Sequence, residues 1–184
     1  MFKRKNRRSL IEQVKQVFWP SMGWRRFGLY LKHRTLRLSD SPRNIALGLA
    51  IGAGVSFSPI MFTHFVQAGI LAFIFRANLP AAIIGTAIGN PWTFPLIWWA
   101  SLGLGSGIFA MMGFPVEAMP PDNMTWSMMW DMILNNPKRL FFPWMLGGYI
   151  LCVIITLGLY YIYYPLIKGA QSARRHKFAK EHKQ

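Results

Sequence analysis

The sequence predicts an all-α integral membrane protein, built from transmembrane helices and from helical hairpins that proline interrupts. Three observations predict this class. Hydrophobic residues make up 53% of the 184 residues, with 14 Phe, 8 Trp and 11 Met. Basic residues give a net charge of +15, yet they are concentrated at the two ends of the chain. Two long apolar stretches between these ends are each interrupted by a polar residue followed by proline.

The N-terminal region, residues 1–40, predicts basic amphipathic helices. In Ser9–Trp19 the apolar side chains recur at the spacing of one helix face, and Gly23–Leu36 places aromatic side chains opposite basic ones. Such helices usually lie in the membrane interface, and packing onto the protein's own helices is the alternative. Because the basic residues directly flank apolar segments, we expect a bilayer with anionic headgroups as their partner and no nucleic acid.

The first apolar stretch, Ile45–Phe75, is interrupted at Ser58-Pro59, which we call the first interruption. The stretch follows Ser41-Pro42, a pair typical of a helix start. The helix after it is rich in Gly and Ala, which let helices approach closely in a bilayer. Proline inside a helix removes a backbone donor and clashes with the preceding turn, so a second helix, Ile60–Phe75, is expected to follow the interruption.

The second apolar stretch, Leu79–Met112, is interrupted at Asn90-Pro91, the second interruption. Its layout matches that of the first stretch. This match favours a repeated membrane unit, and chance similarity between apolar sequences is the alternative. In hydrocarbon, interrupted backbone is tolerated only where it is buried in protein or lines a polar cavity. The two interruptions therefore predict a polar site near the middle of the membrane.

The rest of the membrane domain, residues 41–167, contains one hydrophilic loop and one uninterrupted helix. The loop covers residues 113–140. Phe141–Ile167 predicts a transmembrane helix with four tyrosines near its end, where aromatic residues commonly mark the interface. A basic tail, residues 168–184, follows it.

The distribution of charge predicts the orientation. Both ends of the chain are strongly basic, so both are expected in the cytoplasm, with the loop 113–140 in the periplasm. This arrangement requires an odd number of crossings between Pro42 and Met112. Two simple interrupted spans would give an even number. At least one interrupted segment is therefore predicted to be a re-entrant hairpin that enters and leaves on the same side.

Polar residues within the apolar stretches are the candidate binding residues, because polar groups inside a bilayer are costly. Arg76 is a candidate phosphate contact, and snorkelling to the interface is the alternative. Asn78 and Asn90 are candidates for ligand binding or for satisfying backbone groups at the breaks. His64 and Gln67 lie three residues apart on one helix face. For His64, a packed and hydrogen-bonded residue is the alternative to a functional one.

Several kinds of chemistry are not expected. No carboxylate lies between Asp40 and Glu117, which argues against an enzyme with paired intramembrane carboxylates. Cys152 is the single cysteine, and no Cys/His cluster has the spacing of a metal site. We therefore predict no catalytic residues, no metal and no cofactor.

Several segments resemble a bacterial membrane family catalogued as domain of unknown function 2062. The resemblance extends from about Trp24 to Tyr164, and its motifs lie in Ser41–Gly52, Ser58-Pro59, Phe75–Ala82 and Gly85–Pro95. It implies a protein of the cytoplasmic membrane, in a family sometimes fused to a glycosyltransferase that uses lipid-linked sugars. The chain departs from the family pattern after Pro59, where Ile60 stands in place of an expected glycine. The layout also resembles that of the DedA-type lipid transporters, which use paired re-entrant hairpins.

Together these features predict a multi-pass protein of the bacterial inner membrane. The expected function is translocation or binding of a lipid or a lipid-linked glycan, such as a polyprenyl phosphate. The alternative is an assembly or structural subunit that contacts a membrane-protein partner or a second copy of itself.

Overall fold

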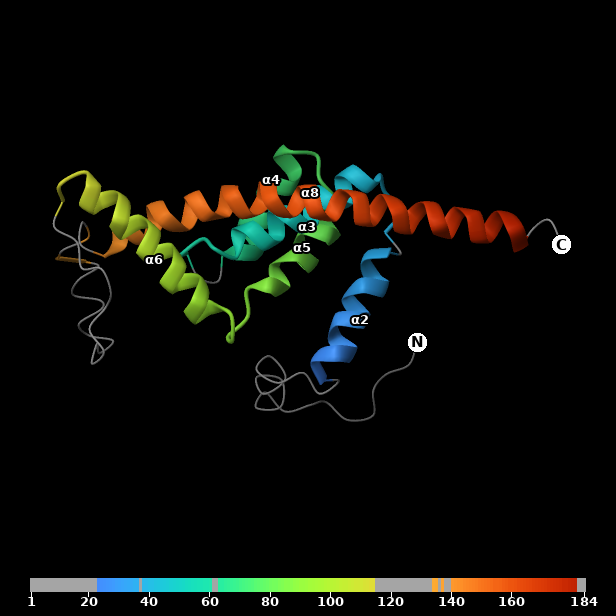
Figure 1. The fold of residues 1–184 in the computed structure, drawn as a ribbon, viewed down its shortest axis with the longest axis horizontal. Helices are drawn as coiled ribbons and strands as arrows, with labels where there is room; N and C mark the ends of the chain where they lie inside the picture. Colours follow the sequence, from blue (N-terminus) through green and yellow to red (C-terminus); the bar gives the residue numbers. More distant parts are fainter. Residues whose placement is uncertain are drawn as a thin grey trace. The chain divides into compact units, whose positions relative to one another are not determined.

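The computed structural model describes residues 23–36, 38–60, 63–114, 134–135, 137 and 140–181 (Figure 1). All regular elements within these residues are helical, as the fold class predicts. The chain divides into two compact units, Met1–Arg37 and Leu38–Gln184. In the first unit, α2 covers Gly23–Leu36, which confirms the predicted helix and its bounds. The helix predicted over Ser9–Trp19 lies outside the described residues.

The second unit begins with α3, Pro42–Val55, whose start follows local capping chemistry. The Ser41 hydroxyl accepts a hydrogen bond from the Asn44 backbone N–H at 3.2 Å, and Pro42 occupies the first turn, as predicted. Nine of the 14 residues of α3 are buried. At about 1.5 Å per residue the helix is about 21 Å long, which is shorter than the hydrocarbon core of a bilayer.

The helix after the first interruption, α4, covers His64–Ile74. It begins later than the predicted Ile60 because a compact turn holds the backbone at Pro59 and Ile60. Its C-terminal end returns to the beginning of α3, where the Asn78 N–H donates to the Asn44 carbonyl at 3.0 Å. Helices α3 and α4 therefore form an antiparallel hairpin that begins and ends at the same end of the unit.

The next helix, α5 (Leu79–Gly85), continues as a 3-10 turn, η1 (Thr86–Ile88). It runs parallel to α3 and very close to it. A Cβ atom on Gly48 would overlap the Asn78 carbonyl oxygen, and one on Gly85 would overlap that of Leu49. Glycine at these positions lets the two backbones touch, which is the close approach that the small residues predict.

Two longer helices complete the unit. Helix α6 covers Phe94–Met111, and α8 covers Phe141–Glu181. They cross in antiparallel fashion where Gly105 of α6 faces Pro143 and Gly147 of α8. Helix α8 also runs alongside α3, in the opposite direction, since Gly54 contacts Cys152 and Thr156 while Ile45 packs with Ile167 (Figure 1).

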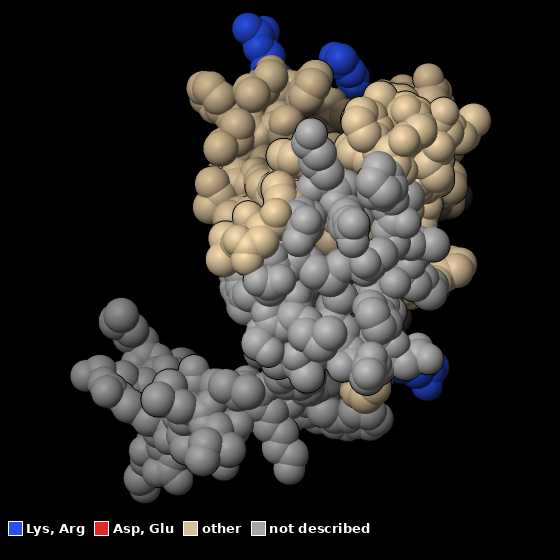
Figure 2. All heavy atoms as spheres, turned by 90° about the vertical axis from the view of Figure 1, so that its left-hand side faces the viewer, with Lys and Arg blue, Asp and Glu red and all other residues tan. Residues whose placement is uncertain are grey.

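Helix α8 is longer than the predicted Phe141–Ile167, because it continues through Pro165 into the basic tail. The tail contains the helix formers Ala170, Gln171 and Ala173, and no proline follows Pro165. Within the described residues, two helices are long and apolar enough to cross a membrane, namely Phe94–Met111 and the part of α8 from Phe141 to Arg174. Figure 2 is a view onto the end where α6 meets α8. On this side, the described part of the surface consists almost entirely of uncharged residues.

Candidate functional site

Two side chains of α4 form hydrogen bonds with Ser58 at the first interruption. His64 Nε2 lies 3.0 Å from the Ser58 carbonyl oxygen. Because a carbonyl oxygen only accepts, this contact requires the hydrogen on Nε2. Gln67 donates from Nε2 to the Ser58 hydroxyl at 3.0 Å. His64 is buried, with 9% of its surface exposed. Three predicted residues, Ser58, His64 and Gln67, thus come together next to Pro59.

Thr63 extends this cluster. Its hydroxyl donates to the Ile60 carbonyl at 2.7 Å and accepts from Gln67 Nε2 at 2.6 Å. The cluster therefore supplies hydrogen bonds to backbone that Pro59 removes from a helix. Two acceptor atoms of the cluster, His64 Nδ1 and Gln67 Oε1, take no part in these bonds.

At the second interruption, the side chains of Asn90 and Thr93 form hydrogen bonds with the neighbouring backbone groups. Asn90 Oδ1 accepts from the N–H groups of Trp92 and Thr93, at 3.0 and 3.1 Å. The Thr93 hydroxyl donates to the Ile88 carbonyl at 2.6 Å and accepts from the Asn90 N–H at 3.0 Å. Asn90 thus satisfies the backbone around Pro91 at the start of α6, which is the structural alternative that the sequence left open.

The two interruptions lie side by side. The His64 ring stacks on Phe94, the first residue of α6, with centroids 5.8 Å apart. The Ser56 hydroxyl, just before the first interruption, lies 3.4 Å from the Thr86 carbonyl, just before the second. Stacking continues from Phe94 to Trp98, and Trp98 meets Trp144 of α8 edge to face at 5.7 Å. The two interruptions therefore form one site, which is flanked by aromatic rings.

Arg76 and Asn78 lie elsewhere, at the opposite end of α4 from His64. Asn78 Oδ1 caps α5 by accepting from the Ala81 N–H at 2.9 Å, and its Nδ2 donates to Asp40 at 2.9 Å. Arg76 is exposed in the turn between α4 and α5. Arg76 and Asn78 therefore do not lie beside the two interruptions. The turn that carries it returns to the start of α3, about 16 Å of helix away from the first interruption.

Asp40 is a functional candidate that the sequence analysis missed. Its Oδ1 accepts from the Ser41 N–H at 2.7 Å and from Asn44 Nδ2 at 2.9 Å, and its Oδ2 accepts from Asn78. Its backbone carbonyl accepts from Gln171 of α8 at 3.1 Å. Burial raises the pKa of this carboxyl, but the three donated hydrogen bonds outweigh that effect and hold the pKa below its usual value of 3.8. The position of Asp40 directly before the Ser41 cap indicates its bond to the Ser41 N–H, but not its contacts with Asn78 and Gln171.

Arg76 has a backbone conformation that usually belongs to glycine. Its φ is 52°, the one positive value among the described non-glycine residues. The Arg76 N–H bonds to the Phe73 carbonyl and the Ala77 N–H to the Ala72 carbonyl, which is the Schellman arrangement that ends many helices. Glycine adopts this left-handed position without the steric penalty that arginine incurs.

We expect Arg76→Gly to stabilise the fold by about 0.5–1 kcal/mol, because relief of the left-handed strain exceeds the added flexibility of the unfolded chain. Thermal unfolding of the purified protein in detergent measures this change. Ala77→Gly, at a neighbouring position with ordinary φ, is the control and should lower stability. A loss of stability in Arg76→Gly would contradict the prediction.

The comparisons with known proteins give one family. The model of a family described as "Uncharacterized protein conserved in bacteria (DUF2062)" matches residues 25–176, more than four fifths of the chain. No curated protein and no solved structure matches the chain.

Proposed function

The chain belongs to the bacterial DUF2062 family, and from this premise we propose that it is an integral inner-membrane protein that binds and translocates a lipid or lipid-linked glycan. Its apolar helices support the membrane location. Of the 18-residue apolar segment of each helix, only 28% is buried within the protein in α6 and 11% in α8. Core helices of a soluble protein would be mostly buried, so these surfaces suit a bilayer.

The proposed topology follows from where the helices turn. The α3–α4 hairpin begins and ends at the Asp40 end of its unit, so it serves as the re-entrant segment. Helices α5 and α6, joined at the second interruption, make one crossing, and α8 returns. The two ends of the chain then lie on the same side, in the cytoplasm. The loop 113–140 lies in the periplasm.

The observation that carries the translocation proposal is the single polar site formed by the two interruptions. Short helices that end within the membrane and side chains that bind free backbone groups are features of transporters with discontinuous helices. Here the acceptors His64 Nδ1 and Gln67 Oε1 are suited to the hydroxyl groups of a glycan or an isoprenoid alcohol. The site combines a buried imidazole with amide and hydroxyl groups and holds no carboxylate among the described residues. We therefore propose binding and passage rather than catalysis.

Reconstituted protein should accelerate the flipping of a labelled polyprenyl phosphate between the leaflets of vesicles. Gln67→Leu keeps the size of the side chain but removes its hydrogen bonds, and we expect flipping to fall about tenfold or more. Val66→Leu, an exposed neighbour on α4, is the control. Val66→Leu should unfold at the wild-type temperature. Because Gln67→Leu also loses its bonds to Ser58 and Thr63, flipping is compared at a temperature at which thermal unfolding shows both variants to be folded. Wild-type protein that flips the lipid no faster than empty vesicles would refute the proposal.

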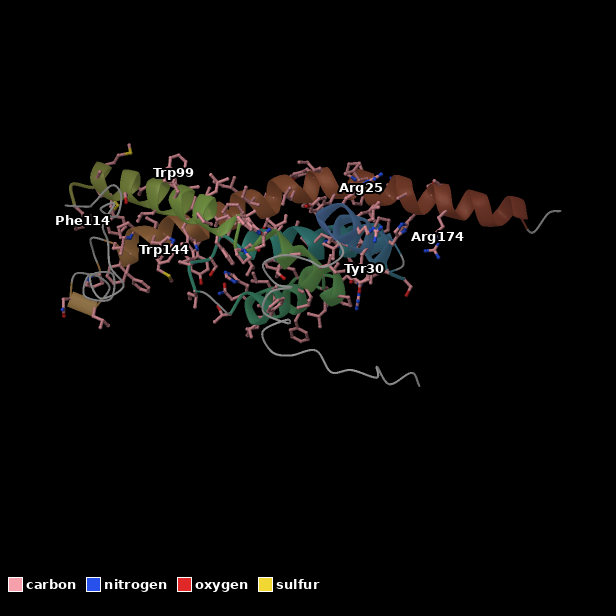
Figure 3. All side chains as sticks on the ribbon, turned by 90° about the horizontal axis from the view of Figure 1, so that it is seen from below. Arg25, Tyr30, Trp99, Phe114, Trp144 and Arg174 are labelled. Atoms are coloured by element: carbon pink, nitrogen blue, oxygen red, sulfur yellow. The ribbon has the colours of Figure 1, made fainter. Side chains whose placement is uncertain are left out.

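A second candidate function, assembly within a larger membrane complex, is supported by an open face of α6. Gly103 and Gly107 have no atom within 4 Å of the position of an added Cβ. Trp99, 58% exposed, lies on the side of α6 turned away from α8 (Figure 3). Small residues on a lipid-facing surface permit close helix contacts. A stoichiometric partner that co-purifies in mild detergent would favour this function over translocation by a lone protein.

A further inference from the structure

Four basic residues from three parts of the chain are brought to the Asp40 end of the second unit. Asp40 binds Asn44, Asn78 and Gln171, which belong to the start of α3, the start of α5 and α8. Each basic residue lies next to one of these partners or within one helical turn of it. The four are Arg43, Arg76, Lys168 and Arg174, and we call them the basic end.

Among the described side chains, the one carboxylate at this end is Asp40, and it accepts hydrogen bonds from neutral groups. Both oxygens of Asp40 accept such bonds, namely from the Ser41 N–H and the amides of Asn44 and Asn78. Asp40 is also the sole carboxylate among the residues whose side chains are described. Its role is to hold three elements together. Among the described side chains, its one negative charge lies near the positive charges of Arg43, Arg76 and Lys168. The basic end therefore keeps a net positive charge that suits an external anion.

Arg76 is the member whose placement most needs an explanation. It adopts a left-handed φ of 52°, where glycine would serve the fold better. Its side chain is exposed, and within the described residues its guanidinium takes part in no hydrogen bond or ion pair. A strained residue with no structural use for its side chain points to a function outside the chain.

The position of Lys168 sets the depth of the basic end in the membrane. It follows the apolar part of α8 directly, and its Nζ lies 5.9 Å from the centre of the Tyr164 ring. Tyr160, Tyr161, Tyr163 and Tyr164 precede it, and such tyrosine clusters lie at the level of lipid headgroups. Arg174 lies further along α8, within the basic tail (Figure 3).

We propose that the basic end binds the phosphate headgroup of an anionic phospholipid in the leaflet it faces, with Arg76 as the principal contact. A guanidinium binds phosphate through two parallel hydrogen bonds, and Arg43 and Lys168 add positive charge beside it. This inference shares with the proposed function only the insertion of the protein in a membrane. Lipid binding here requires neither flipping nor the polar site at the interruptions.

The test measures lipid affinity of the full-length protein in a neutral detergent, by native mass spectrometry with added dioleoyl phosphatidylglycerol. We expect saturable binding, with at least about tenfold weaker binding of dioleoyl phosphatidylcholine. Arg76→Gly, which removes the guanidinium and relieves the strain, should raise the apparent Kd about tenfold while the protein stays folded. Arg76→Lys keeps the charge without the paired hydrogen bonds, so its Kd should lie in between.

Two results would overturn the proposal. One is an equal loss of affinity in Arg25→Gln, an exposed arginine on α2, because total positive charge would then explain binding. The other is full displacement of the lipid by an equal concentration of glycerol 1-phosphate, which would identify a soluble phosphate as the ligand. Lipid binding that persists in protein unable to flip polyprenyl phosphate would support this inference and count against the proposed function alone.

Discussion

Replacing Gly105 by alanine should force α6 away from α8 and destabilise the protein by about 3 kcal/mol. A Cβ atom at this position would overlap the Pro143 carbonyl oxygen, and backbone cannot move aside as a flexible side chain can. On the other side of the contact, a Cβ on Gly147 would overlap the Ser101 carbonyl oxygen. The backbones of the two helices are in direct contact here. Adding even one methyl group therefore forces the helices apart.

Gly103 on the same helix provides the matched control. It has open space around an added Cβ, so Gly103→Ala should leave stability unchanged or raise it by less than about 1 kcal/mol. Thermal unfolding in detergent, followed by tryptophan fluorescence, compares the variants, because Trp98 and Trp144 meet beside this contact. Equal stability of Gly103→Ala and Gly105→Ala would show that α6 does not pack on α8 through Gly105.

The sequence predicted the elements whose ends depend on local chemistry. The start of α3 follows from Ser41 and Pro42, which act within the first turn of the helix. It predicted α4 and α8 less well. The Thr63 hydroxyl binds the Ile60 carbonyl directly before α4, so that helix begins after Ile60. Helix α8 continues past its predicted end at Ile167 into the basic tail.

The candidate site was predictable in part for the same reason. His64 and Gln67 lie close to Ser58 in the sequence, and their spacing on one helix face already placed them together. The role of Asp40 depends on partners 38 and 131 residues away, so no local pattern reveals it. The position of Arg76 likewise depends on the return of α4 to the start of α3, which only the packed structure defines.

Asp40→Asn should destabilise the second unit by about 2 kcal/mol, because it places two hydrogen-bond donors, the NH₂ groups of residues 40 and 78, opposite each other. The new amide must direct its oxygen to the Ser41 N–H and Asn44, so its NH₂ group would face the NH₂ group of Asn78. Asn78 cannot turn round without loss, since its oxygen caps α5 through the Ala81 N–H. Thermal unfolding at neutral pH measures the effect, with Ser39→Ala as the control.

Exchanging the side chains of Asp40 and Asn78 should restore the stability that Asp40→Asn removes. In the double variant Asp40→Asn/Asn78→Asp, the amide introduced at position 40 donates to the carboxylate introduced at position 78, whose other oxygen still caps α5. We expect at least half of the lost stability to return. A double variant no more stable than Asp40→Asn would show that the Asp40–Asn78 hydrogen bond does not hold α3 to α5.

The acid sensitivity of the wild type offers a second measurement of the same contact. Because the folded-state pKa of Asp40 is depressed, its contribution to stability is complete above pH 3.8 and is lost as the pH falls through the folded-state value. Asp40→Asn has no carboxyl at this position, so it should lack this part of the acid sensitivity. Unfolding of both proteins across this range, in the same detergent, therefore isolates the charged form of Asp40 as the group that joins α3 to α5.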